Sequence, residues 1–384
     1  MRIAFVTLGY QPLRTSGLDM SGERLVTALL EAGHEVTVIA GQSGSQRETH
    51  AHPLLHVYRV PLDRTDWIGF AVRAAALRKR LGAFDVTHFW DVHFGFAYRG
   101  AYVASLQHSF HQRINSLGNA AFTTLKGGYR YVYYTLARYL AEIPALRRAD
   151  GLLAGSATTA QEFIRYYPLR PERVRIARHG VDTSFFQRTE RATEVRRRLG
   201  LGLQEPVLLF AGFITPRKGL EVLAQAFADV HPRPKLVLVG KWRNEAYRQQ
   251  VYRLLEPFKR RVIEAGFVAD EEMPAYYSMA DAYVSPSLLE GFGLPIAEAL
   301  ACKTPVVACD SGAVAEVMGP GGILVPPGDP VLLARALSDL LANPGLGRDK
   351  GEQGYIHVRR NFSIQTMLET TLAAYNTFCT SYDR

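Results

Sequence analysis

The feature that most constrains the fold is a regular alternation of short apolar runs with segments of helix length. This alternation is typical of parallel β-strands joined by helices, and the continuous apolar character of the runs indicates strands covered on both faces. In the first half of the chain the runs are 3–7, 35–40, 85–88, 102–106, 151–154 and 174–177. In the second half they are 207–211, 235–239, 262–264, 282–284, 305–308 and 322–325. Two such series predict two doubly wound, Rossmann-like α/β domains.

The two series are separated by residues 182–206, a polar and basic segment that ends in Gly and Pro and is typical of a linker. With 384 residues the chain is long enough for two complete cores. We therefore expect an N-terminal domain over 1–180 and a C-terminal domain over 200–362. Parallel sheets bind ligands at the carboxyl ends of their strands, so two sheets that face each other would enclose a cleft suited to a substrate.

Cysteine usage and charge narrow the class of protein. Cys302, Cys309 and Cys379 are too few for a disulfide scaffold and have no Cys or His at metal-ligand spacing, which favours a cytoplasmic location. The apolar run 3–8 is too short for a signal peptide, and no apolar run is long enough to predict a membrane span. The net charge of +9 suits phosphorylated ligands, anionic lipid or simple solubility. We expect no nucleic acid, because the basic residues are scattered and no nucleic-acid-binding module is present.

One segment, residues 110–148, departs from the alternation because it combines five tyrosines with Lys and Arg. It predicts a helix, an interruption at Gly127-Gly128 and a second helix. A basic aromatic face suits an anionic membrane surface, which would make the protein peripheral at the inner face of a membrane. A helical lid packed on its own domain is the alternative, and we favour it.

A glycine, Gly17, follows the first predicted strand. Ser16 with Asp19 resembles a capping box, and Leu25 and Leu29 mark one face of the helix that follows. The free N–H groups and the dipole of such a helix start would favour a phosphate, and Gly17 would let it approach. A turn glycine without a ligand is the alternative.

A lysine, Lys218, lies between the strand 207–211 and the next predicted helix and is followed by Gly219. A lysine at a strand-to-helix turn can neutralise a diphosphate, and Arg217 beside it would add a second positive charge. A solvated residue at the helix start is the alternative.

The most informative motif is SPSLLEGFGLPIAE, residues 285–298. It predicts the end of a strand, a glycine loop and a helix with Pro295 in its first position. Gly293 lets the backbone reach a ligand without a side chain between them. Glu290 and Glu298 suit the hydroxyls of a sugar or a ribose, since carboxylates accept hydrogen bonds from them.

Together these motifs resemble the retaining GT-B glycosyltransferases of the large family that includes bacterial mannosyltransferases and sucrose-phosphate synthases, glycosyl transferases group 1. The resemblance spans nearly the whole chain. It rests on Glu290 and Glu298 with seven residues between them, and on His179-Gly180-Val181-Asp182 where the family has Asn-Gly-Val-Asp. It implies two Rossmann-like domains facing across a cleft, and a C-terminal helix over 363–384 that crosses back to the first domain.

The resemblance also implies roles for the residues of the glycine loop. Glu290 would hold the transferred sugar and Glu298 the ribose. The backbone amides of Phe292, Gly293 and Leu294 would contact the sugar and the phosphate.

Other site residues follow from their places after predicted strands. His108 follows the run 102–106, where the family carries an active-site histidine. Phe267 and Val268 lie where the nucleobase would be recognised. The family usually has Gly-Arg where this chain has Gly212-Phe213, and Arg217 beside Lys218 is a candidate substitute for that arginine.

The predicted activity is transfer of a hexose from a nucleoside diphosphate sugar to a hydroxyl of a carbohydrate or lipid-linked acceptor, with retention of anomeric configuration. The chain has no Asp-x-Asp pair, so we expect no metal cofactor. Lys218, Arg217 and the helix starts at Gly17 and Gly293 would stabilise the leaving diphosphate. A GT-B epimerase or phosphorylase, and a non-catalytic sugar-binding or nucleotide-binding protein, are the alternatives.

Overall fold

The computed structural model describes residues 1–11, 17–42, 52–62, 66–115, 117 and 125–379. These residues form two compact units. The first comprises Met1–Gly180 together with the segment that begins at Ile364, and the second comprises Val181–Ser363. Each unit is described by itself below.

The first unit is built on a parallel sheet whose described strands follow the order β3-β2-β1-β4-β5-β6-β7. The strands are β1 (Arg2–Thr7), β2 (Glu35–Gln42), β3 (Leu55–Pro61), β4 (Val86–Phe89), β5 (Val103–Leu106), β6 (Gly151–Ala154) and β7 (Val174–Ile176). All but β3 lie within two residues of the predicted runs. The sequence analysis missed β3 because it is an edge strand on which part-buried and exposed side chains alternate, so it carries no continuous apolar run.

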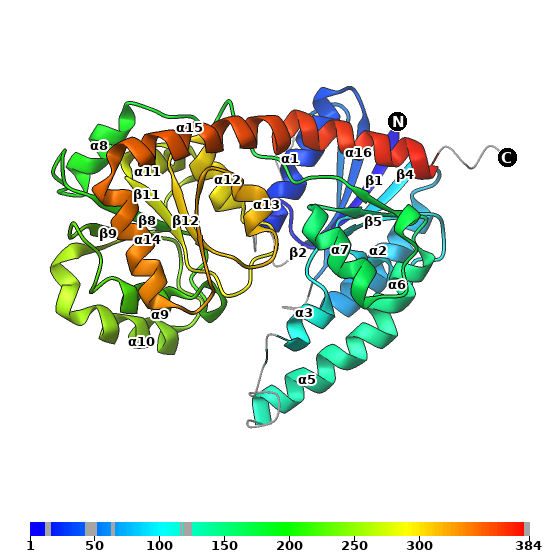
Figure 1. Ribbon diagram of the computed structural model, residues 1–384. Coiled ribbons are helices and arrows are strands. Elements are labelled where there is room, and N and C mark those ends of the chain that lie inside the picture. The colour runs from blue at the N-terminus through cyan, green and yellow to red at the C-terminus, as the bar shows by residue number, and fades with distance from the viewer. Residues whose placement is uncertain (12–16, 43–51, 63–65, 116, 118–124, 380–384) are drawn as a thin grey trace. The chain divides into compact units, whose positions relative to one another are not determined.

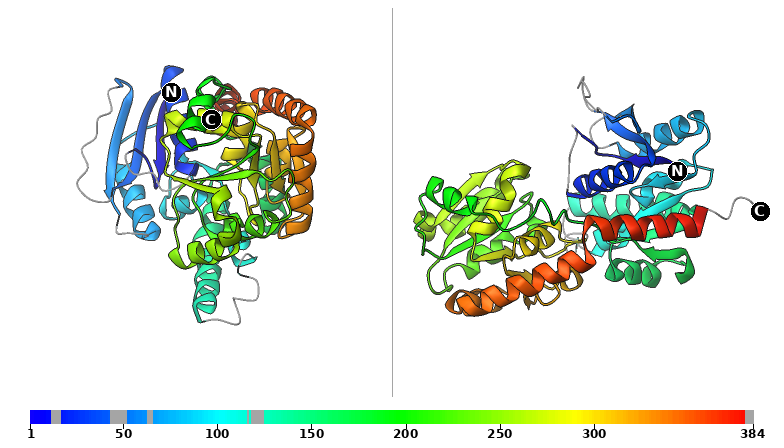
Figure 2. Two further views of the ribbon diagram at one scale, coloured as in Figure 1. Left: turned by 90° about the vertical axis from the view of Figure 1, so that its left-hand side faces the viewer. Right: turned by 90° about the horizontal axis from the view of Figure 1, so that it is seen from above.

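Helices cover both faces of this sheet (Figure 1). They are α1 (Gly17–Glu31), α2 (Trp67–Arg80), α3 (Phe110–Asn115), α5 (Leu125–Ala137), α6 (Ile143–Arg148), α7 (Ala157–Tyr166) and α16 (Ile364–Cys379), with a π-helical turn at Arg138–Glu142 and a 3-10 turn at Val92–Ala97. The C-terminal α16 lies beside α1 (Figure 2). Its Met367 and Tyr375 are buried in the same cluster as Leu25 and Leu29 of α1, so the end of the chain completes the core of the first unit.

The second unit has a parallel sheet of order β10-β9-β8-β11-β12-β13 among its described residues. Its strands are β8 (Val207–Ala211), β9 (Lys235–Val239), β10 (Val262–Gly266), β11 (Ala282–Ser285), β12 (Val306–Cys309) and β13 (Gly322–Val325). Its helices are α8 (Arg191–Arg198), α9 (Leu220–Ala226), α10 (Glu245–Leu255), α11 (Met273–Met279), α12 (Leu294–Ala301), α13 (Val314–Met318), α14 (Pro330–Ala342) and α15 (Pro344–Asn361). Both units are therefore doubly wound α/β folds, as the alternation of apolar runs predicted.

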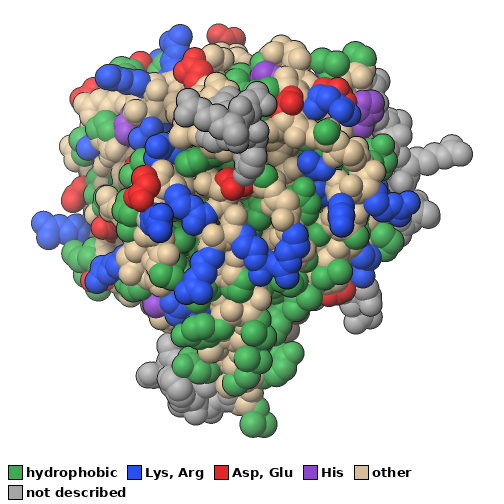
Figure 3. Space-filling view, turned by 90° about the vertical axis from the view of Figure 1, so that its right-hand side faces the viewer, with side chains coloured by type: hydrophobic (Ala, Val, Ile, Leu, Met, Phe, Trp, Pro, Cys, Tyr) green, Lys and Arg blue, Asp and Glu red, His purple; other side chains and the backbone are tan. Residues whose placement is uncertain are grey.

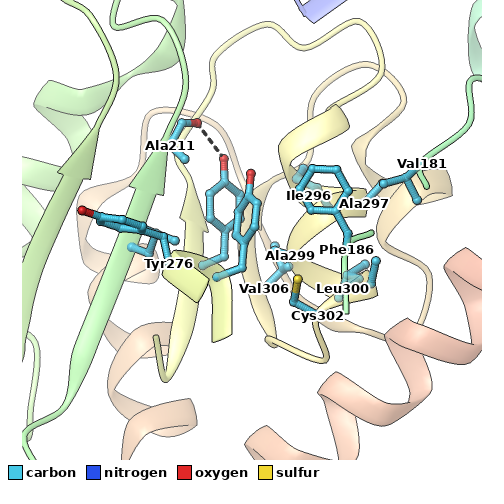
Figure 4. Packing of buried hydrophobic residues seen from close by; sticks show 14 of the residues in the cluster. Val181, Phe186, Ala211, Tyr276, Ile296, Ala297, Ala299, Leu300, Cys302 and Val306 are labelled. Atoms are coloured by element: carbon cyan, nitrogen blue, oxygen red, sulfur yellow. Dashed lines mark hydrogen bonds between the residues drawn. The ribbon is translucent and has the colours of Figure 1, made fainter. Parts of the chain in front are cut away.

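The core of the second unit lies on both faces of the sheet. On one face, Ile296, Leu300 and Cys302 pack with Val306 of β12 (Figure 4). Val181 and Phe186, which precede α8, are buried in this same cluster. The division between the units therefore falls at residues 180 and 181, ahead of the predicted linker, because the start of that segment carries apolar side chains that fill the second core.

Residues 125–148 form one nearly continuous helical stretch of α5, the π-helical turn and α6. The expected interruption at Gly127-Gly128 was wrong, since both glycines lie in the first turn of α5, where a helix tolerates glycine at modest cost. Among the described helices, none is long and apolar enough to cross a membrane.

Candidate active site

The strand order of the second unit's parallel sheet reverses between β8 and β11. From β8 the chain first adds β9 and β10 on one side, and then adds β11, β12 and β13 on the other. In open parallel sheets, ligands bind at the carboxyl ends of the strands where the strand order reverses. The loops that leave β8 and β11 there carry Lys218 and Glu290, so the fold brings together two residues that are far apart in the sequence.

Lys218 and Glu290 form an ion pair in which the lysine Nζ donates to Oε2 of the carboxylate. The two side chains are only 12% and 10% exposed. Ser287 Oγ donates to the same oxygen over 3.2 Å, and Arg217 Nη1 lies 3.8 Å from the other, Oε1. Arg217 therefore points to the same carboxylate as Lys218, although the two are neighbours in the sequence.

The loop that carries Glu290 is held against two glycines. A Cβ atom at Gly219 would lie 2.1 Å from the carbonyl oxygen of Pro286, and one at Gly312 would lie 1.8 Å from that of Glu290. Both glycines have positive φ, 62° and 60°. Ser311 Oγ also donates to the carbonyl oxygen of Ser287 over 2.9 Å. Neither close approach would survive a side chain, so the position of the Glu290 backbone depends on both glycines.

The helix α12 begins directly after this loop, with Gly293 as its N-cap at φ 91°. Pro295 is the second helical residue, one position later than predicted. The backbone N–H groups of Gly293 and Leu294 therefore stand at a helix start, where the dipole favours a negative group. Phe292, just before the cap, is buried.

Glu298 is buried one turn into α12, where Tyr277 OH donates to its Oε2 over 3.0 Å. Tyr283 OH donates to the carbonyl oxygen of Ala211 at the end of β8 over 3.2 Å (Figure 4). Burial raises the pKa of Tyr283 well above its ordinary value, and the negative charges of Glu290 and then Glu298 raise it further. Both glutamates thus lie near one phenol that stays protonated.

The loops after β8 and β9 are joined by a bridge between Ile214 and Trp242. The guanidinium of Arg243 lies 4.2 Å from the centre of the Phe213 ring. After β9 and β10, Lys241 Nζ lies 4.5 Å from the centre of the exposed Phe267 ring. Val268, next to it, is buried. Arg243 and Lys241 therefore add positive charge at the same edge of the sheet.

In the first unit the strand order reverses between β1 and β4. Gly17 is the first residue of α1, while Ser16 lies outside the described residues, so the expected capping box is not described. Asp19 is buried in the first turn of α1 against Gly9, where an added Cβ would lie 2.4 Å from the carboxyl. The start of α1 therefore already carries a negative side chain.

His108 follows β5 and is half-buried. The pKa of a second histidine, His179, is lowered to about 4, mainly by burial and then by the charge of His108. His179 Nε2 is 3.2 Å from the side-chain oxygen of Gln107, and Nδ1 is 3.0 Å from Ser21 Oγ. Neutral His179 therefore donates to Gln107 through Nε2 and accepts from Ser21, which ties α1 to the loop that carries His108.

Three of the contacts at these sites involve residues that the sequence analysis did not select. Ser287, which donates to Glu290, belongs to the motif 285–298 and could have been found from its place there. Tyr277, on α11, and Arg243 gave no comparable signal, because their partners Glu298 and Phe213 come from other loops and helices.

Comparison with known proteins places the chain in a family. Two family models match it, Glycosyltransferase Family 4 over residues 15–185 and Glycosyl transferases group 1 over residues 205–343. The D-inositol 3-phosphate glycosyltransferase of Xylanimonas cellulosilytica is 30% identical over 381 residues, which cover 90% of this chain and 89% of that protein. The chain belongs to the group 1 glycosyltransferases. This glycosyltransferase is also 31% identical over 268 residues to the alpha-maltose-1-phosphate synthase of Mycolicibacterium smegmatis, covering 65% of this chain and 67% of that protein.

Solved structures agree with this glycosyltransferase in fold. Sucrose-phosphate synthase from Thermosynechococcus elongatus has a TM-score of 0.83 at 22% identity, covering 99% of both chains. HepE from Anabaena, in complex with UDP-glucose, has a TM-score of 0.76 at 18% identity, covering 98% of this chain and 100% of that one. The architecture is therefore GT-B, as the resemblance implied, and the enzyme is a glycosyltransferase.

Proposed function

We propose that this glycosyltransferase transfers a hexose from a nucleoside diphosphate sugar to an acceptor hydroxyl, with retention of anomeric configuration and without a metal ion. The observation that carries the proposal is the Lys218–Glu290 pair, held where the strand order reverses, beside the start of α12. It supplies a cation for phosphate and a carboxylate for sugar hydroxyls from adjacent loops.

The donor diphosphate would be bound by Lys218, Arg217 and the N–H groups at Gly293 and Leu294. Lys218 and Arg217 both lie against Glu290. One carboxylate thus engages both cations and leaves a net positive charge, and an arriving diphosphate would draw the two cations toward itself. These groups would stabilise the negative charge that builds on the leaving phosphate, the task that a divalent ion performs in metal-dependent enzymes.

Arg243 offers a further cation for the same phosphates. Its guanidinium rests on the Phe213 ring, at the position where the family usually has an arginine. An aromatic face holds a planar guanidinium in a fixed orientation. We propose that Arg243, in the loop after β9, supplies the positive charge that the family's arginine would provide at the position of Phe213.

The two glutamates would bind hydroxyl groups. Glu290 would accept hydrogen bonds from the transferred sugar, and Glu298, whose Oε2 accepts from Tyr277, would accept from the ribose. Phe267 and Val268 would contact the base, and backbone N–H groups at Phe292 would contact the sugar.

Retention is what the family resemblance implies, and no side chain in this proposal is suited to form a covalent intermediate. Glu290 is engaged by Lys218 and Ser287, and it serves the sugar hydroxyls. A same-face displacement, in which the leaving phosphate takes the acceptor proton, requires no covalent enzyme intermediate. His108, from the first unit, would contact the sugar and the acceptor.

The test is thermal stabilisation by UDP, GDP, ADP and dTDP, followed by transfer from the matching sugar donor. The HepE structures contain UDP and UDP-glucose, and several relatives are named for D-inositol 3-phosphate, so UDP-glucose and inositol phosphate belong in the first panel. A ligand that binds only the folded state raises the unfolding midpoint. We expect one nucleotide to do so in the wild type and not in Lys218→Ala, with Lys259→Ala, an exposed surface lysine, as the control.

Three results would count against the proposal. Stabilisation that is equal in Lys218→Ala would place the phosphate elsewhere. Sugar conversion with no acceptor would indicate an epimerase, and dependence on free phosphate would indicate a phosphorylase.

A further inference from the structure

An exposed apolar stripe runs along α5 and the π-helical turn that follows it. Its side chains recur at intervals of three and four residues, which places them on one face of the helix. They are Leu125, Tyr129, Val132, Leu136 and Leu140, each between 53% and 98% exposed. We call this set the outer stripe.

The opposite face of the same helix is already packed. Trp67 Nε1 donates to Tyr133 OH over 2.5 Å, and the Tyr134 ring lies 6.0 Å from that of Phe110. Ala137 and Ala141 are buried. A helix on the surface of a globular protein normally turns a polar face to water. The packed face is the one that a lid on its own domain requires. The outer stripe takes no part in that packing.

The exposed charges within residues 125–148 have one sign. Residues 125–148 contain five Lys and Arg and a single acidic residue, Glu142. Glu142 is fully buried, where it accepts hydrogen bonds from His93 and from the backbone N–H of Phe110. The exposed charge of the segment is therefore positive. In Figure 3, hydrophobic side chains gather at the lower end of the molecule, and Lys and Arg side chains lie above them.

We propose that the outer stripe docks this enzyme on the surface of a bilayer that contains anionic lipid. Leucine and valine side chains would enter the boundary between head groups and acyl chains, tyrosines suit that boundary, and the arginines would meet the lipid phosphates.

A second copy of the chain fits the outer stripe less well. Symmetric pairing through this face would bring the same positive charges of both copies together, with the one acidic residue of the segment buried and unable to balance them. Anionic lipid supplies that balance.

The experiment is flotation of the full-length enzyme with vesicles of phosphatidylcholine alone and of phosphatidylcholine with phosphatidylglycerol. The test variant is Val132→Gln with Leu140→Gln, and its control is Ile356→Gln with Val331→Gln on α15 and α14. The pairs are matched, since Val132 and Ile356 are 56% and 57% exposed, and Leu140 and Val331 are 70% and 71% exposed.

We expect the wild type and the control variant to float with anionic vesicles, and the test variant to bind them at least about tenfold more weakly. Binding should also weaken when salt is raised, because exposed charges are screened. All three proteins should keep the same unfolding midpoint and the same response to nucleotide, so a failure here is distinct from a failure of the donor-site proposal.

The proposal is overturned if the wild type does not bind anionic vesicles, or if the test variant binds them with the same affinity as the wild type. It is equally overturned if the wild type is a dimer in solution that the test variant converts to a monomer.

Discussion

His88 of β4 and Tyr375 of α16 share a hydrogen bond of 2.7 Å across 287 residues of sequence. Both side chains are buried, and the other ring nitrogen of His88 lies 2.8 Å from Ser105 Oγ on β5. Burial lowers the pKa of His88 to about 3, so the ring is neutral at physiological pH. The C-terminal helix is thus attached to the middle of the first unit's sheet by a polar contact inside its core.

Removal of this contact should destabilise the first unit. In Tyr375→Phe the hydroxyl is lost and a buried histidine nitrogen loses its partner, which costs about 1 to 3 kcal/mol of unfolding free energy. Urea unfolding followed by tryptophan fluorescence measures this, since all three tryptophans can be monitored together. Tyr58→Phe, on an exposed edge strand, is the control and should change little. Equal stability of the two variants would show that the bond contributes nothing net.

The buried cluster of Asp91, His93 and Glu142 should make stability depend on pH. Burial alone would lower the pKa of His93, but the carboxylates of Asp91 and then Glu142 outweigh it and raise that pKa to about 9. The folded state therefore holds a proton that the unfolded state releases near pH 6.5. The contribution of His93 is complete below that pH and is lost as pH rises through about 9.

The measurement is the unfolding midpoint of the wild type and of His93→Gln between neutral and alkaline pH. We expect the wild type to lose stability across this range and the variant to start lower and change less. At the acid end the sign reverses for Asp91, whose pKa is lowered, so its contribution is lost as pH falls. Parallel alkaline curves for the two proteins would contradict the assignment.

The contributions of the Lys218–Glu290 pair to catalysis and to stability should be separable. Lys218→Met leaves a mostly buried carboxylate without its main partner, so we expect a loss of about 2 kcal/mol of stability and at least about a hundredfold loss of transfer. The double variant Lys218→Met with Glu290→Gln should regain stability, because no buried charge remains, yet stay inactive. Thermal melts and donor turnover measure the two effects, and recovery of activity in the double variant would refute a direct role in catalysis.

Arg243→Ala should weaken donor binding about tenfold while the fold survives, because one phosphate cation is lost from an exposed position. Arg253→Ala, an exposed arginine on α10, is the matched control. Titration of nucleotide by calorimetry gives the dissociation constants. If Phe213→Leu weakens binding as much as Arg243→Ala, the ring acts by holding the guanidinium, whereas wild-type affinity in Arg243→Ala removes the arginine from the site.

Much of the fold could be predicted because buried parallel strands are apolar throughout, as in 207–211 and 151–154. The edge strand β3 could not, since its exposed side chains interrupt the run. The motif 285–298 could be interpreted because its strand, glycines and helix start are adjacent in sequence. The contacts of Arg243 with Phe213, and of Glu142 with His93, depend on how separate loops and helices meet, which residue spacing does not encode.

The two units of this chain are synthesised in one order and complete their folding in the opposite order. Residues 1–180 leave the ribosome first, yet the core they form includes Met367 and Tyr375 of α16. The second unit, Val181–Ser363, contains all of its own core and can finish folding while the first still waits for its last helix. The unit that is made first is therefore completed last, and until α16 has been made its uncovered α1 surface can meet chaperones or misassemble.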